Sequence, residues 1–405
     1  MKFIDFFAGI GGFRRGLELA GHECVGFCEF DKFAVASYTS MHLINSERRI
    51  FLNTLDLRKR QKEILREEYR NGEWYANDIR RIYAGDIPNA DCWCFGFPCQ
   101  DVSVAGNQTG LSGHRSSLFF AVTRLIRNLE EESKPTYLFI ENVKNLLSVN
   151  RGFDFLKILS ELDEIGYDVE WDVINSAEYV PQKRERVFII GHLRGRSGGK
   201  VFPIARDMRK IATFRGQSLG KVEQLGTKID FGNQPRTQDR IYSARGISPA
   251  LLCSGGKNGA NIAIPVLTPF SSTTQDSCGI AVKVATKKGY EFAALGDSIN
   301  LAVPSSKTRR GRVGKAIVNT LDTSCNYGVL VEMPEGFTVY AIWSENYQCY
   351  IAIRRLTPKE CFRLQGWEDE YFERAAFVNF NNQLYKQAGN GVTVPVIRAI
   401  GGLLI

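Results

Sequence analysis

The sequence predicts an α/β fold with a mostly parallel sheet covered by helices on both faces, plus a smaller, irregular and mostly β domain. Two observations carry this prediction. The first 190 residues alternate short apolar runs with amphipathic stretches, which is typical of βαβ units. After about residue 195 the chain is rich in Gly, Ser, Thr and Pro, and its hydrophobic periodicity is weak.

The expected strands of the first domain are near-continuous apolar runs, as is typical of strands that helices bury on both faces. They cover residues 3–7, 24–28, 92–96, 137–140, 169–174 and 186–190. Apolar residues from Leu118 to Leu129 recur at helical spacing and predict one buried helix face. Residues 56–70 predict a charged, solvent-exposed helix inserted between two units.

The changes in composition predict three parts of the chain, residues 1–195, 196–383 and 384–405. Residues 195–200 are rich in Gly, Ser and basic side chains, which indicates a linker. Residues 384–405 return to strong helical patterning and predict a helix that docks back on the first domain.

Composition and charge narrow the class of protein. Hydrophobic content of 44% and charged content of 24% are ordinary for a soluble globular chain of 405 residues. No apolar run reaches membrane-spanning length and no signal-peptide pattern precedes the first expected strand, so we expect a cytoplasmic protein. The net charge is +8, and residues 305–315 hold five basic side chains and no acid. Such clusters suit either a solvated face or contacts with nucleic-acid phosphates.

The ten cysteines are too sparse for a disulfide scaffold, and a cytosolic chain would keep them reduced. Cys92, Cys94 and Cys99 lie close enough in sequence to raise the question of zinc. Pairs separated by two residues are missing, however, and His114 is the only nearby imidazole. We therefore expect no metal site.

Polar side chains follow several of the apolar runs. Glu29, Asp86, Cys99 and Glu141 all come shortly after such a run. In open parallel sheets, ligands bind in the crevice beyond the carboxyl ends of the strands. A single carboxylate there commonly caps the next helix, whereas several carboxylates and a cysteine around one crevice favour a functional site.

The first turn, residues 7–12, reads Phe-Ala-Gly-Ile-Gly-Gly and lies between an expected strand and a helix. Glycines in this place let the backbone approach a ligand and offer amide donors. Glu29 lies 20 residues beyond Gly9, the spacing at which an acid meets ribose hydroxyls. Arg14 stands where the third glycine of the dinucleotide fingerprint belongs. A cofactor with a ribose but no pyrophosphate therefore fits better.

The segment around Cys99 is the most informative one. Pro98 restrains the chain and biases Phe97 toward an extended conformation. A buried, inert thiol is the usual fate of cysteine. Here the polar residues Gln100 and Asp101 follow Cys99 directly, which favours a loop and an accessible thiol.

In this order, the motifs resemble those of the cytosine-5 DNA methyltransferase family of bacteria and phages. They are residues 7–12, Gly-Phe-Pro-Cys-Gln at 96–100, Glu-Asn-Val at 141–143, Gln-Lys-Arg-Glu-Arg at 182–186, residues 354–366, and Gln-Ala-Gly-Asn-Gly-Val at 387–392. The resemblance covers nearly the whole chain and is weakest at 45–80 and 200–350. It implies the Rossmann-like fold of S-adenosylmethionine-dependent methyltransferases. Residues 1–195 would then be the catalytic and cofactor-binding domain and residues 196–383 the target-recognition domain.

The resemblance implies a chemical role for four residues. Cys99, as thiolate, would attack carbon 6 of cytosine and make carbon 5 nucleophilic. Glu141 would hold N3 and the exocyclic amine, while Arg186 would contact the O2 side of the ring and Arg184 would support the pocket. Because carbon 6 is inaccessible in a base stack, the target would be flipped out of the duplex. No metal is needed.

The resemblance also implies S-adenosylmethionine as cofactor. Its amino acid portion would meet the glycine loop, its ribose Glu29, and its adenine the residues after the second strand and before the expected strand 92–96. The implied contacts are Phe7, Gly9, Ile10, Gly11, Gly12, Glu29, Phe30, Asp86, Ile87, Pro98, Leu118, Asn390 and Val392.

For DNA, the resemblance implies that Ser103 contacts phosphate. Arg240 lies in a segment that resembles the part reading the major groove, where it would bind either a guanine or a phosphate. Arg309, Arg310 and Arg312 are expected to bind the DNA backbone. The chain would act as a monomer on duplex DNA, with any cognate restriction endonuclease acting separately.

Three other readings stay open. The family's RNA branch methylates transfer RNA, but the long region 200–350 favours DNA. A catalytically inactive DNA-binding relative is disfavoured because Cys99, Glu141, Arg184 and Arg186 are all present. A nicotinamide oxidoreductase would need the missing third glycine.

Overall fold

A computed structural model describes residues 1–97, 117–196, 199–204 and 356–404 of the chain. Between 204 and 356 it describes shorter stretches, which are residues 224–227, 240–242, 280–293, 297–300, 311–315, 317–319, 327–329, 342–344 and 349–351. No helix of this described part is long and apolar enough to cross a bilayer.

A seven-stranded sheet forms the centre of the first domain, in the order β3-β2-β1-β4-β5-β8-β6. Its strands are β1 (Lys2–Phe6), β2 (Glu23–Cys28), β3 (Trp74–Ala76), β4 (Cys92–Phe95), β5 (Tyr137–Val143), β6 (Tyr167–Asn175) and β8 (Glu185–Leu193). Strands β1 to β5 pair in parallel, whereas β8 is antiparallel to both β5 and β6. The predicted α/β fold is confirmed, with all six expected strands present. The three-residue strand β3 was not expected.

Helices cover both faces of this sheet. They are α1 (Gly12–Leu19), α2 (Lys32–Tyr38), the π-helix η1 (Thr39–Leu43), α3 (Ser46–Asn53), α4 (Leu57–Glu63), α5 (Ser117–Arg127), α6 (Phe153–Glu164), α8 (Pro358–Leu364), α9 (Asp369–Ala376), α10 (Asn381–Asn390) and α11 (Val394–Gly401). Alternate residues of a strand point to opposite faces. Ile4 and Phe6 of β1 accordingly join the core under α5 and α6, while Phe3 joins the core under α1 and α11.

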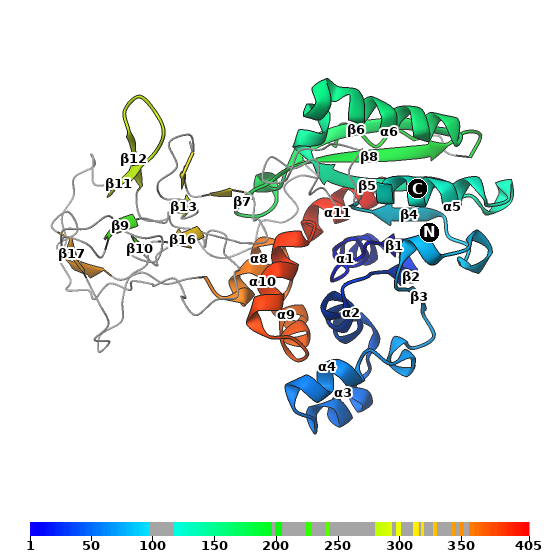
Figure 1. The fold of residues 1–405 in the computed structure, drawn as a ribbon, viewed down its shortest axis with the longest axis horizontal. Coiled ribbons are helices and arrows are strands. Elements are labelled where there is room, and N and C mark those ends of the chain that lie inside the picture. The colour runs from blue at the N-terminus through cyan, green and yellow to red at the C-terminus, as the bar shows by residue number, and fades with distance from the viewer. Residues whose placement is uncertain are drawn as a thin grey trace.

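The C-terminal helices return to the first domain, beside α1 (Figure 1). A Cβ atom on Gly16 of α1 would lie 2.5 Å from Cβ of Ile397 on α11, so the two helices pack closely only because Gly16 has no side chain. We expected this docking to begin at residue 384, but it begins earlier in the chain. Helix α9 already contacts the first domain, since Nη1 of Arg374 donates to the carbonyl oxygen of Met41 at 2.9 Å.

The inserted region 56–70 differs from the single exposed helix that we expected. It forms α4 and the short 3-10 helix η2 (Glu67–Arg70), and it docks on the end of α9. Arg60 donates to the carbonyl oxygen of Phe377 at 2.8 Å, and its guanidinium lies 3.9 Å from the centre of that ring. Ile64 and Tyr69 are buried against the same region. Charge patterning alone did not reveal this packing partner.

The described stretches between 204 and 356 are short strands that lie beside the first domain (Figure 1). They pair as β9 (Gln224–Thr227) with β10 (Arg240–Tyr242), β11 (Ile280–Lys283) with β12 (Tyr290–Ala293), β13 (Ser298–Asn300) with β14 (Val313–Gly314) and β16 (Tyr327–Val329), and β17 (Ile342–Ser344) with β18 (Cys349–Ile351). One strand, β15 (Val318–Asn319), pairs with β7 (Gln182–Lys183) of the first domain. The described stretches of this region are rich in short β-strands, as predicted.

Candidate active site

One edge of the sheet collects the predicted functional residues. The carboxyl ends of the parallel strands β1, β2, β4 and β5 meet there, and they lead into Phe7, Glu29 and Gly96, with Glu141 within β5. Because β8 is antiparallel, its first residues lie at the same edge, and Arg186 pairs with Val143 of β5. Strand direction therefore brings a cation beside the carboxylate of Glu141.

A cavity opens at this edge between the glycine loop, strand β5 and the start of the C-terminal segment. Six of the residues predicted to bind the cofactor line it, together with Gly96 and Glu141. The lining consists of Phe7, Ala8, Gly9, Ile10, Gly12, Phe13, Gly96, Glu141, Asn390, Gly391 and Val392. A Cβ atom on Gly12 would lie 2.6 Å from Cγ2 of Val392, so the glycine lets these two walls meet.

The glycine loop has a left-handed backbone at three positions, Phe7 (φ 54°), Gly9 (φ 56°) and Gly11 (φ 84°). Glu29 holds it in this shape, because its Oε2 accepts a hydrogen bond from the amide of Gly9 at 2.8 Å. Its Oε1 accepts another from the amide of Asp31 at 2.7 Å. Burial raises the pKa of the Glu29 carboxyl, and these amide donors oppose the rise.

The residues predicted to hold the adenine lie outside this cavity. Phe30 is 68% exposed and Asp86 is exposed, so both are accessible to a ligand. Ile87 and Leu118 belong to the hydrophobic core under α5, Leu118 at its partly buried margin. Pro98 lies outside the described residues.

Glu141, which lines the cavity, forms an ion pair with Arg186. Oε1 of Glu141 lies 3.1 Å from Nε of Arg186, and Glu141 is only 8% exposed. Oε1 nevertheless accepts no well-aligned hydrogen bond within the described part of the chain. A buried carboxylate oxygen in this state retains capacity to accept a hydrogen bond from a ligand. Gly96 leaves room for the Glu141 carboxylate, since a Cβ at position 96 would lie 3.3 Å from Oε2 of Glu141.

Arg184 and Arg186 are two residues apart in the sequence, but their side chains have different surroundings. Its side chain is 3% exposed and binds the C-terminal segment. Nη2 donates to the carbonyl oxygen of Gly391 at 2.8 Å, and Nη1 donates to that of Gly389 at 3.4 Å. These two carbonyls flank Asn390, so Arg184 supports one wall of the cavity.

Asn142 is a further site residue, for which the motif had suggested no role. It is 1% exposed, and its Nδ2 donates to the carbonyl oxygen of Phe97 at 3.2 Å. Its Oδ1 accepts from the amide of Val143 at 2.8 Å. Asn142 thus anchors the backbone two residues before Cys99. A lone amide side chain in the apolar run of β5 was the available signal for it.

The remaining predictions fall largely outside the described residues. Cys99, Ser103 and Arg310 lie outside them, as does the side chain of Arg240, whose backbone belongs to β10. Arg312 is described and is 1% exposed. A guanidinium buried to this degree does not face a DNA backbone, so the predicted phosphate contact of Arg312 is not supported.

Cys92 and Cys94 lie in the hydrophobic core under α1 and α11, with their sulfur atoms 3.6 Å apart. Burial raises the pKa of the Cys94 thiol well above its usual value. Within the ranges that the structure describes, no three His, Cys, Asp or Glu side chains are grouped as metal ligands.

Several known proteins are similar to this chain over most of its length. A family model described as C-5 cytosine-specific DNA methylase matches residues 1–215 and 269–405. The orphan methyltransferase M.SPRI of Bacillus phage SPR is 26% identical, covering 99% of this chain and 96% of the relative. The type II methyltransferase M2.ScrFI of Lactococcus lactis subsp. cremoris is 28% identical, covering 99% and 98%. The type II methyltransferase M.HhaI of Haemophilus parahaemolyticus is 30% identical, covering 63% and 75%.

Proposed function

The chain belongs to the C-5 cytosine-specific DNA methylase family, and we propose that it methylates carbon 5 of a flipped-out cytosine within a short specific sequence of duplex DNA. The methyl donor would be S-adenosylmethionine. The observation that carries the proposal is one cavity lined by the glycine loop, Glu141 and the Asn390 segment, with Arg186 paired to Glu141.

The residues present fit this donor. A Cβ at Gly9 would meet no atom of the described residues within 4 Å, so this part of the chain leaves space beside the loop where a ligand would lie. The Glu29 carboxylate stands beside that space, where it suits ribose hydroxyls, and the exposed ring of Phe30 suits an adenine face. When bound, the donor supplies an electrophilic methyl group on a sulfonium. Phe7, Gly9 and Asn390 would hold its amino acid portion.

The chain's own residues would then act on the base. Glu141 would accept a hydrogen bond from the exocyclic amine of cytosine through Oε1, which accepts no aligned hydrogen bond from the described residues. To bind N3, which is itself an acceptor, Glu141 would carry or share a proton. Arg186 would orient Glu141 and meet the O2 side of the ring. Asn142 would fix the backbone at Phe97, two residues before Cys99.

Every bond that forms in the covalent reaction is matched by one that breaks. The Cys99 thiolate would form a bond to carbon 6, and the electron pair of the 5,6 double bond would move to carbon 5. Carbon 5 would take the methyl group as the methyl–sulfonium bond breaks. Carbon 5 would then release its proton to a base, and the double bond would re-form as the bond between sulfur and carbon 6 breaks.

Tritiated methyl transfer to duplex DNA and to transfer RNA tests the proposal directly. We expect label in DNA only, and bisulfite sequencing should locate it at cytosines in one sequence context. Cys99→Ser should abolish transfer while leaving DNA binding largely in place. DNA carrying 5-fluorocytosine should give an adduct with the wild type that survives denaturing gels, because fluorine cannot leave as a cation. Label in transfer RNA alone, or full activity of Cys99→Ser, would overturn the proposal.

A further inference from the structure

The left-handed glycine loop has a second support besides Glu29. Nε2 of His42 lies 3.0 Å from the carbonyl oxygen of Ile10, in the middle of the loop. Two lone pairs would repel each other at this distance, so Nε2 carries the proton and donates it to Ile10. His42 lies in the π-helix η1, which directly follows α2.

A π-helical turn places His42 there. The turn is η1, and its closing bond runs from the amide of Ile44 to the carbonyl oxygen of Thr39 at 3.2 Å, five residues back. Such turns insert an extra residue into a helix and are frequent at functional sites. The loop lies directly on the imidazole, because a Cβ on Gly11 would be 2.5 Å from Nε2 of His42. Only glycine fits at Gly11.

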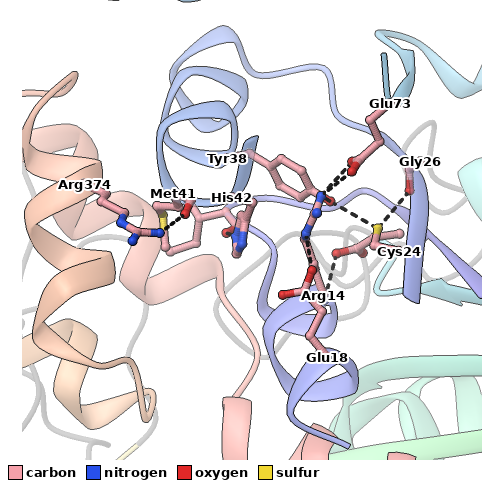
Figure 2. A network of polar contacts seen from close by, with 11 residues as sticks. Arg14, Glu18, Cys24, Gly26, Tyr38, Met41, His42, Glu73 and Arg374 are labelled. Atoms are coloured by element: carbon pink, nitrogen blue, oxygen red, sulfur yellow. Dashed lines mark hydrogen bonds and ion pairs between the residues drawn. The ribbon is translucent and has the colours of Figure 1, made fainter. Parts of the chain in front are cut away.

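Hydrogen bonds join η1, the turn that carries His42, to the C-terminal helix α9. Nη1 of Arg374 donates to the carbonyl oxygen of Met41 (Figure 2), and Oγ of Ser40 donates to the carbonyl oxygen of Arg374 at 2.6 Å. These bonds tie η1 to α9. Three aromatic rings surround the imidazole, with centroid distances of 4.9 Å to Tyr38, 5.5 Å to Tyr371 and 6.0 Å to Trp367.

The charges around His42 keep it neutral. Burial lowers the pKa of His42 well below its ordinary value, and the neighbouring cations Arg14, Arg15 and Arg374 lower it further. Arg14 belongs to a buried network in which its Nη1 lies 2.7 Å from Oε1 of Glu73 (Figure 2). A neutral imidazole has one N–H, and in His42 that group is directed at Ile10.

We propose that His42 is a positioning residue for the methyl donor, which fixes the backbone of residues 9–11 through its bond to the Ile10 carbonyl and its packing against Gly11. This inference rests on the proposed function, because it assigns the loop to S-adenosylmethionine. His42 itself does not line the cavity, and it acts through the loop.

Substitutions at His42 test this role with matched controls. His42→Leu removes the donor, and the loss of one neutral hydrogen bond corresponds to a rise of about threefold to tenfold in KM for the donor. We expect kcat at saturating donor to stay within about twofold of the wild type. His42→Gln should restore KM, because its amide reaches the position of Nε2, whereas the shorter His42→Asn should not.

His22 offers the control for a general loss of stability. Its Nε2 lies 2.8 Å from the carbonyl oxygen of Gly401, a bond of the same kind far from the loop. His22→Leu should lower the unfolding midpoint and leave KM for the donor unchanged. Should His42→Leu fail to fold, the Gln and Asn variants carry the comparison.

Binding of S-adenosylhomocysteine, measured by calorimetry, should follow the same order as KM. An unchanged KM in folded His42→Leu, or equal behaviour of the Gln and Asn variants, would overturn the positioning role while wild-type methylation of DNA still stood. A wild type that binds neither donor nor product analogue would refute the proposed function itself.

Discussion

Replacing Arg184 by methionine would remove the guanidinium that supports the cavity wall while keeping most of the volume of the side chain. The guanidinium makes one bond of 2.8 Å to Gly391 and one of 3.4 Å to Gly389. A hydrogen bond from a charged donor contributes about 1.5–3 kcal/mol, and it weakens toward the longer distance. The shorter bond dominates, so we expect a loss of about 2–4 kcal/mol in the free energy of unfolding.

The same change should weaken donor binding. Asn390 lies between the two supported carbonyls and lines the cavity, so a looser segment displaces one of its walls. We expect the dissociation constant of S-adenosylhomocysteine to rise by at least about tenfold, since small misplacements of a site are costly. Urea unfolding, monitored by circular dichroism, measures the change in the free energy of unfolding. Titration calorimetry measures the change in the dissociation constant.

Arg127→Met provides the control, because this arginine is 41% exposed and pairs with Glu161 and Glu164 on the surface. Exposed ion pairs contribute less than about 1 kcal/mol, so its unfolding and its donor binding should stay near those of the wild type. If Arg184→Met matches the Arg127→Met control in both measurements, the Arg184 guanidinium does not support the cavity wall.

The remaining predictions concern the loop anchor, helix packing and pH. Asn142→Leu should lower kcat by about tenfold with little change in donor affinity, because it frees the Phe97 carbonyl two residues before Cys99; an unchanged single-turnover rate would contradict this. Gly16→Ala should cost about 1–2 kcal/mol in urea unfolding, since a clash of about 2–3 kcal/mol with Ile397 outweighs a helix-propensity gain of about 1 kcal/mol; equal or greater stability would contradict the close packing. His42 has a folded pKa well below 6.5, so below pH 6.5 the unfolded chain binds a proton that the folded chain refuses, and stability falls. In His42→Gln the unfolding midpoint should fall less steeply than in the wild type as the pH is lowered below 6.5. An identical slope in the two proteins would show that His42 does not cause the fall.

Much of the architecture was readable from local sequence. The expected strands that became β1, β4 and β5 were runs of apolar residues, and burial on both faces of the sheet requires that composition. The edge strand β6 instead alternates apolar and acidic residues and is partly exposed. The family resemblance rested on the order of short motifs and is confirmed by the family model. The very short strand β3 lacked such a run, and the packing of α4 on α9 involves residues more than 300 positions apart.

The sequence by itself determined the α/β class, the glycine loop, the spacing of Glu29 and the residues available for cytosine chemistry, because these depend on composition and on neighbours along the chain. The tertiary structure decided the antiparallel direction of β8, which puts Arg186 beside Glu141. It also separated the tasks of Arg184 and Arg186 and brought His42 under the glycine loop. Hydrophobic periodicity indicates which residues of a helix or strand are buried. It carries no information on strand direction or on which distant segment covers them, and those are set when the whole chain packs.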